Sequence, residues 1–134
     1  MKTTTMYLPM AAILFSAALL VPAAAQTYVP FKGSMQGHEV DTPQGAPPTT
    51  LALNGSVTGN GTQVGQFSFI YQLTVNLANG TAIGTARFIA ANGDSVYTTV
   101  VGSGEETATP GVDSITEINT ITGGTGRFAG AQGS

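Results

Sequence analysis

The residues that could do chemistry are few and far apart. The single histidine, His38, stands beside Glu39, and neither a Gly-x-Ser-x-Gly nucleophile turn nor an HExxH helix accompanies the pair. One histidine and seven scattered acidic residues make a poor ligand set for catalytic zinc. We therefore predict no catalytic residue, no metal site and no cofactor. His38 is expected on a surface strand or loop.

Two other patterns resemble binding motifs. Glu105, Glu106 and Asp113 could hold calcium from a loop, but they lack the alternating Asp/Asn spacing of a calcium loop, so solvated acids are the simpler interpretation. The run Gly124-Thr-Gly126 is similar to part of a dinucleotide loop. No amphipathic helix follows it, so the sequence favours a turn.

Aromatic residues are the better candidates for a binding site. Tyr71, Phe88 and Tyr97 fall on segments with strand-like alternation and could line a ligand cavity. A small barrel packs its interior with the same residue types, so close packing is the alternative interpretation.

Length and charge limit the partners. The chain has 134 residues, 18 glycines and no cysteine, which favours one domain and excludes a disulfide scaffold or a cysteine-based zinc site. The three basic residues after the first segment, Lys32, Arg87 and Arg127, are scattered among seven acidic ones. Nucleic acid and anionic membranes, which require clustered positive charge, are therefore not expected partners.

Residues 1–25 have the three parts of a secretory signal peptide. Lys2 gives the positive start, Met6 to Leu20 is uncharged and apolar, and Ala23-Ala24-Ala25 fits a signal peptidase site before Gln26. We expect cleavage between Ala25 and Gln26, and a secreted or periplasmic protein of bacterial origin without stable membrane insertion. An uncleaved membrane anchor is the alternative.

The rest of the chain favours β-strands. Large residues alternate from Phe67 to Leu77, which predicts a strand with one apolar face. Further strands are expected at Phe31–Val40, Leu51–Gly59, Asp113–Ile121 and from Arg127. Loops are expected at Asp41–Thr50, which has three prolines, and at Gly102–Val112.

Turn signals recur at Asn54-Gly55, Asn60-Gly61, Asn79-Gly80, Asn92-Gly93, Pro110-Gly111 and Gly123-Gly124. Three of these lie in Asn-x-Ser/Thr glycosylation sequons, at Asn54, Asn60 and Asn79, which we interpret as hairpin turns.

Two of these turns predict strand registers. A two-residue turn at Asn79-Gly80 would place Tyr71 opposite Phe88, and one at Asn92-Gly93 would place Phe88 opposite Tyr97. The three rings would then form one cross-strand row on the inner face.

The run from Thr122 to Gly133, TGGTGRFAGAQG, carries a family resemblance. It is similar to the strand-turn-strand signature of the allene oxide cyclase and dirigent barrel superfamily, as are Gly61-Thr-Gln-Val-Gly-Gln-Phe67 and Ala90-Ala-Asn-Gly-Asp94. The resemblance covers roughly Phe31 to Ser134. The residues that carry its structural motif are Gly123, Gly124, Gly126, Phe128, Gly130 and Gly133.

The resemblance implies an antiparallel, eight-stranded, calycin-like barrel over residues 26–134. It also implies a role for an acidic residue in the cavity, for which Glu117 stands near the matching position. Family members continue with at least one more strand where this chain stops, so we expect a C-terminally incomplete barrel that associates through an open edge.

Three functions remain open from the sequence. The first is an exported, non-catalytic barrel that binds a small apolar ligand. The second is a cyclase-like or dirigent-like catalyst or guide for an oxidised lipid or phenol. The third is a structural or adhesive surface domain without a ligand.

Overall fold

The computed structural model describes residues 29–134 as one antiparallel sheet followed by a short 3-10 turn. The expected signal peptide, residues 1–25, lies outside the described residues. The strands are long and run consecutively: β1 (Gly33–Gly45), β2 (Pro48–Gly61), β3 (Gly65–Asn76), β4 (Thr81–Ala90), β5 (Ser95–Glu106) and β6 (Asp113–Gly124), before η1 (Gly126–Phe128). The all-β prediction is confirmed, and no α-helix is present among these residues.

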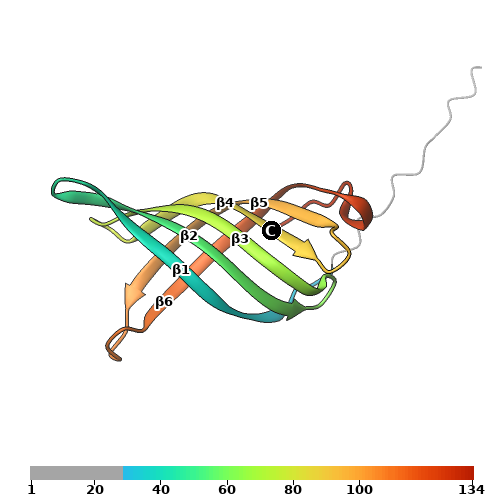
Figure 1. The fold of residues 1–134 in the computed structure, drawn as a ribbon, viewed down its shortest axis with the longest axis horizontal. Helices are drawn as coiled ribbons and strands as arrows, with labels where there is room; N and C mark the ends of the chain where they lie inside the picture. Colours follow the sequence, from blue (N-terminus) through green and yellow to red (C-terminus); the bar gives the residue numbers. More distant parts are fainter. Residues whose placement is uncertain (1–28) are drawn as a thin grey trace, which may run out of the picture.

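The sheet is a meander in which each strand pairs with its neighbour in the chain. It is strongly twisted, and the strands run obliquely along the length of the molecule (Figure 1). β1 and β6 each pair with one strand only, so the six-stranded sheet is not closed. Its inner face carries most of the buried side chains, and its outer face carries residues of the opposite parity, among which Ser95 is buried beneath the C-terminal turn.

The predicted register between β3 and β4 is wrong by two residues. Tyr71 pairs with Ala86 and Phe69 pairs with Phe88, because the hairpin loop spans residues 77–80 and not Asn79-Gly80 alone. Asn76 explains the longer loop: its carbonyl accepts the N–H of Gly80, and its side-chain oxygen accepts the N–H of Ala78. A shift of two residues keeps every side chain on its predicted face.

The predicted register between β4 and β5 is wrong by one residue, which has a larger effect. The loop has three residues, 91–93, closed by Ala90 N–H to the Asp94 carbonyl, with Gly93 at φ 88°. Phe88 therefore pairs with Val96, and Tyr97 pairs with Arg87 on the outer face. The proposed inner row of three rings does not form, because a shift of one residue reverses the face of a whole strand.

Several predicted loops and turns are parts of strands. β1 continues to Gly45 and β2 starts at Pro48, so the expected loop at Asp41–Thr50 shrinks to a turn at Ala46-Pro47. Pro43 is tolerated because β1 is an edge strand, and a proline also fits the first position of β2. β5 likewise runs to Glu106, inside the expected loop at Gly102–Val112.

Two other local predictions fail. Asn54-Gly55 is a central part of β2 and not a turn, and the strand expected from Arg127 is instead the 3-10 turn η1. The turn signals at Asn60-Gly61, Asn92-Gly93 and Pro110-Gly111 do lie at or beside strand ends.

Large and small inner residues alternate between neighbouring strands. Leu73 faces Gly84, Val75 faces Ala82, and Tyr71 faces both Gly55 and Ala86. The buried cluster consists of Val64, Phe67, Phe69, Leu73, Ala86 and Val100. Small partners let the sheet curve tightly over these side chains, as in the interior of a barrel.

Candidate ligand-binding site

Aromatic rings line one end of the concave inner face. The ring centroids of Phe69 and Phe88 lie 4.3 Å apart, and Phe88 also contacts Phe67 at 5.6 Å and Phe31 at 5.7 Å. Phe128 packs against the same cluster from the C-terminal turn. Strand alternation places Phe67, Phe69 and Phe88 on one face, and Phe31 and Phe128 pack against them from outside the strands. Together these rings form an apolar floor.

Tyr71 links the aromatic floor to a polar group. Its ring contacts Phe69, at a centroid distance of 5.4 Å, and lies across Gly55 of β2, where a methyl group would collide with it. The phenol then donates a hydrogen bond of 2.6 Å to a carboxylate oxygen of Glu39 on β1. Gly55 is therefore the residue that lets a side chain of β3 reach β1 across β2.

Two more acidic residues share this inner face. Asp41 follows Glu39 by two positions on β1, and Glu117 lies on β6 opposite Gly102. Burial, the hydrogen bond to Glu39 and the nearby charges raise the pKa of Tyr71 far above its ordinary value. Partial burial, followed by the negative charge of Glu39, raises the pKa of Glu117. The carboxyl groups from the two edge strands thus influence one another.

A second polar pair lies beside these acids. Thr98 is buried on β5 and donates a 2.8 Å hydrogen bond to the side-chain oxygen of Asn119 on β6. The inner face thus combines an aromatic floor with a set of polar side chains, which we call the polar tier. The polar tier consists of Tyr71, Glu39, Asp41, Glu117 and the Thr98–Asn119 pair.

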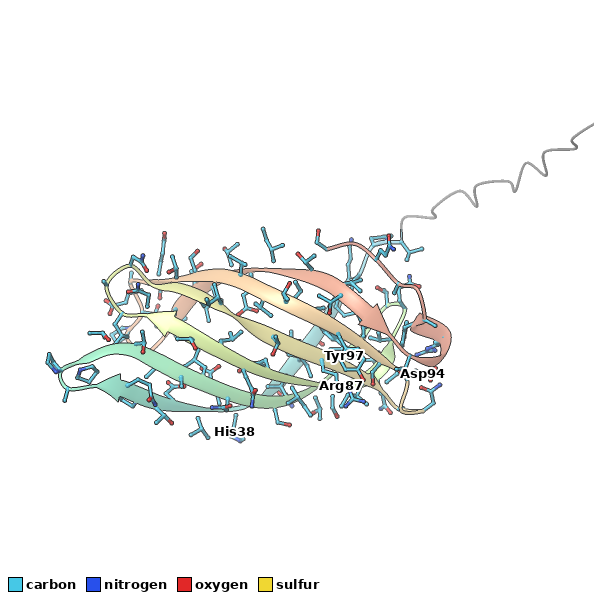
Figure 2. The ribbon with its side chains drawn as sticks, turned by 90° about the horizontal axis from the view of Figure 1, so that it is seen from above. His38, Arg87, Asp94 and Tyr97 are labelled. Carbon is cyan, nitrogen blue, oxygen red and sulfur yellow. The ribbon has the colours of Figure 1, made fainter. Side chains whose placement is uncertain are left out.

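The predicted binding residues are only partly brought together. Tyr71, Phe88 and Glu117 share the inner face, whereas Tyr97 is on the outer face. There the guanidinium carbon of Arg87 lies 5.2 Å from the centre of the Tyr97 ring, and Arg87 donates two hydrogen bonds to Ser95 Oγ. Figure 2 shows Arg87 and Tyr97 next to each other, with His38 projecting from β1 elsewhere on the surface. Tyr97 therefore does not contact the aromatic floor.

The C-terminal turn is fastened to the start of β5. The Thr125 hydroxyl accepts the N–H of Ser95, and the Thr125 N–H bonds the Ser95 carbonyl. Asp94 accepts hydrogen bonds from the Arg127 N–H and from the Asn92 side chain, which lower its pKa. Asp94 lies beside this turn in Figure 2.

The motif glycines occupy crowded or left-handed positions in this turn. A methyl group on Gly124 would meet Phe128, and one on Gly126, at φ 55°, would meet Asp94. Gly130 and Gly133 also have positive φ, and the Gly133 carbonyl accepts the Ile121 N–H at the free edge of β6. Gly123 lies at the irregular pairing with Tyr97.

Sequence reasoning missed Glu39 and Asp41 as inner-face residues. The proline-rich stretch favours a loop from Asp41 onward, and Glu39 stands out in the sequence only as a neighbour of His38. Gly37, Glu39 and Asp41 occupy alternate positions of β1 and therefore share one strand face. Gly37 pairs with the apolar Val57, and this alternation is the signal that could have identified both acids as inner-face residues. His38 has the opposite parity and lies on the outer face.

The chain matches no protein-family model, and it is significantly similar to no curated protein and no solved structure. Within residues 29–134, no group of three or more His, Cys, Asp or Glu side chains could hold a metal ion. No helix in that range is long and apolar enough to cross a membrane.

Proposed function

We propose that this protein is exported and binds a small apolar ligand on the concave face of its sheet. The observation that carries the proposal is the aromatic floor beside the polar tier, on a face that no second layer covers within the described residues. Inner-face residues near both edges remain open, with Met35 52% and Ile115 67% exposed. Exposed apolar surface next to a few convergent polar groups is typical of ligand sites.

The charges on this face favour a neutral or cationic ligand. Glu39, Asp41 and Glu117 lie on the inner face near Tyr71, and Glu106 and Asp113 share that face at its far end, whereas Arg87 and His38 lie on the outer face. Arg127 lies against the aromatic floor, with its guanidinium carbon 4.7 Å from the centre of the Phe128 ring. A carboxylate placed beside Tyr71 would be repelled by these acids in a partly dry environment. An apolar molecule with a hydroxyl or amine group could instead donate a hydrogen bond to Glu39 or Glu117.

Three naphthalenes that differ in one substituent test this selectivity. We expect 2-naphthol and 2-(aminomethyl)naphthalene to shift the amide NMR signals of β3 and β5, and 2-naphthoate to bind about tenfold more weakly. The double variant Glu39→Gln/Glu117→Gln should remove the difference. Glu105→Gln, on the outer face at the far end of β5, is the control for a loss of negative charge outside the inner face.

Each outcome of this titration is informative. If none of the three compounds shifts inner-face signals, the concave face is not an apolar binding site. If naphthoate binds as well as naphthol, the site exists but the acids do not select the ligand.

A second candidate function is favoured by Glu117. Its raised pKa lets it keep a proton at a higher pH than an ordinary glutamate, and it faces the Tyr71–Glu39 pair across the sheet. Such an arrangement suits a cyclase-like or dirigent-like catalyst or guide for an oxidised lipid or phenol. Product formation that Glu117→Gln abolishes, without loss of ligand binding, would distinguish catalysis from binding alone.

We also propose that the six strands belong to an eight-stranded, calycin-like barrel of the allene oxide cyclase and dirigent type. The tight curvature and the small inner residues support this proposal. Until the edges of β1 and β6 are covered, they remain open to pairing with another copy of the chain.

Export is proposed from the signal-like residues 1–25. The intact mass of protein recovered outside the cytoplasm tests it, because cleavage before Gln26 removes a defined mass. Recovery of the uncleaved chain in the membrane fraction would contradict it.

A further inference from the structure

The outer face carries a groove that is separate from the proposed apolar site. It is open, has a volume of about 780 Å³, and crosses β1 to β4. Met35, Gly59, Phe67 and Ala90 also line it, but their parity directs their side chains to the inner face. A ligand in this groove would therefore not contact the aromatic floor.

Two parallel rows of side chains form the walls of the groove. Each row passes straight across neighbouring strands, because its members are register partners. The first row is Ser34, Asn60 and Gln66; the second is Gln36, Thr58 and Ser68. Ile89, the partner of Ser68, continues the second row onto β4.

The walls consist of neutral hydrogen-bonding groups. All six side chains in the two rows are amides or hydroxyls, and no Asp, Glu, Lys or Arg lines the groove. Within residues 29–134, none of these six side chains has a hydrogen-bond partner in the protein. Their donors and acceptors are therefore all available to a ligand.

The second groove on the outer face differs in this respect. It has a volume of about 490 Å³ and includes Arg87 and Tyr97, which are already engaged with each other and with Ser95. Its walls also contain Ile70 and the threonines Thr85 and Thr99. It lies on the same face as the larger groove but presents fewer free polar groups.

We propose that the larger groove binds a neutral, polyhydroxylated chain, an unmodified oligosaccharide. The two rows are two residues apart, about 7 Å, and four strands span about 14 Å, which fits an elongated molecule lying across the strands. Amides and hydroxyls match sugar hydroxyls as both donors and acceptors. The acidic net charge of the protein disfavours anionic polymers, and the uncharged walls offer no ion pair to a cationic one.

The test uses four soluble hexasaccharides and the full exported protein. Three are neutral (cellohexaose, maltohexaose and mannohexaose) and one, hexagalacturonate, is anionic. We expect at least one neutral sugar to bind at millimolar concentration and to shift amide signals at residues 34–36, 58–60 and 66–68. Hexagalacturonate should not bind.

Variants separate this groove from the rest of the surface. Asn60→Ala/Gln66→Ala removes two exposed side chains and should weaken sugar binding about tenfold, as expected for two lost hydrogen bonds. Thr85→Ala/Thr99→Ala, in the smaller groove, should leave it unchanged. Circular dichroism and thermal melting check that both variants fold.

Two results would overturn the proposal. One is the absence of shifts with all three neutral sugars at millimolar concentration. The other is binding that Asn60→Ala/Gln66→Ala does not weaken.

Discussion

At the scale of single residues, Gly55 decides how the polar tier is built. Tyr71 can reach Glu39 only because the intervening strand has no side chain at the crossing point. The sequence signal of Asn54-Gly55 is typical of a turn, and here the glycine serves a close approach instead. Local sequence could not distinguish these roles, because the residue that needs the space comes from the next strand.

Gly55→Ala should destabilise the fold by about 1–3 kcal/mol, because the methyl group forces the Tyr71 ring out of its position. Chemical denaturation measures the change. Gly104→Ala on β5 is the matched control: no atom lies near its added methyl group, so we expect a change within about 0.5 kcal/mol. Equal effects of the two substitutions would contradict the assigned role of Gly55.

Glu117 gives a prediction that depends on pH. Its pKa in the folded protein lies above the ordinary value of 4.5, so the folded state holds the proton more tightly than the unfolded state. Below pH 4.5 both states are protonated and nothing is lost. As the pH rises from there through the raised pKa, ionisation weakens the folded state.

Glu117→Gln removes this loss. Because Glu117 is only partly buried, the effect is small, and we expect the melting temperature to rise by about 1–3 °C at neutral pH. At about pH 3.5 the variant and the parent should melt together. A variant that melts lower than the parent at neutral pH would show that ionised Glu117 stabilises the fold.

At the scale of elements, loop length was the part that sequence reasoning could not supply. Asn-Gly marks a turn correctly at residues 92–93, but it does not say whether the loop has two, three or four residues. One extra residue moved Tyr97 to the outer face, whereas two extra residues between β3 and β4 left Tyr71 on its predicted face. The alternation within a strand was therefore more informative than the turn signal between strands.

The free edge of β6 can be tested with proline. The Ile121 N–H bonds the Gly133 carbonyl, so N–H groups of the same parity, including that of Ile115, point away from β5. Ile115→Pro should cost little stability and should reduce self-association measured by light scattering. Thr116→Pro removes a bond to β5 and should cost about 3 kcal/mol or more.

The two proline variants control for each other, because they introduce the same residue at neighbouring positions whose N–H groups point in opposite directions. If Ile115→Pro unfolds the protein as readily as Thr116→Pro, the assignment of the free edge is wrong. If the parent protein is monomeric at high concentration, the edges do not associate.

At the scale of the whole molecule, the β-class and most strand positions follow from sequence patterns, but the shape of the site does not. Tyr71, Phe88 and Glu117 come to one face through strand alternation and a six-strand meander. Glu39 and Asp41 join them because β1 extends through a segment whose prolines resemble a loop. Such a convergence depends on tertiary pairing, which a single sequence does not encode locally.

The concave face is proposed to hold a small apolar ligand. Native mass spectrometry of the exported protein, extracted from its producing cell, is the strongest test of this proposal. We expect a species heavier than the bare chain by the mass of one small molecule, neutral or basic and largely apolar, which is lost on gentle activation. Repeated recovery of the bare chain alone, or of a chain carrying only an acidic lipid, would contradict it.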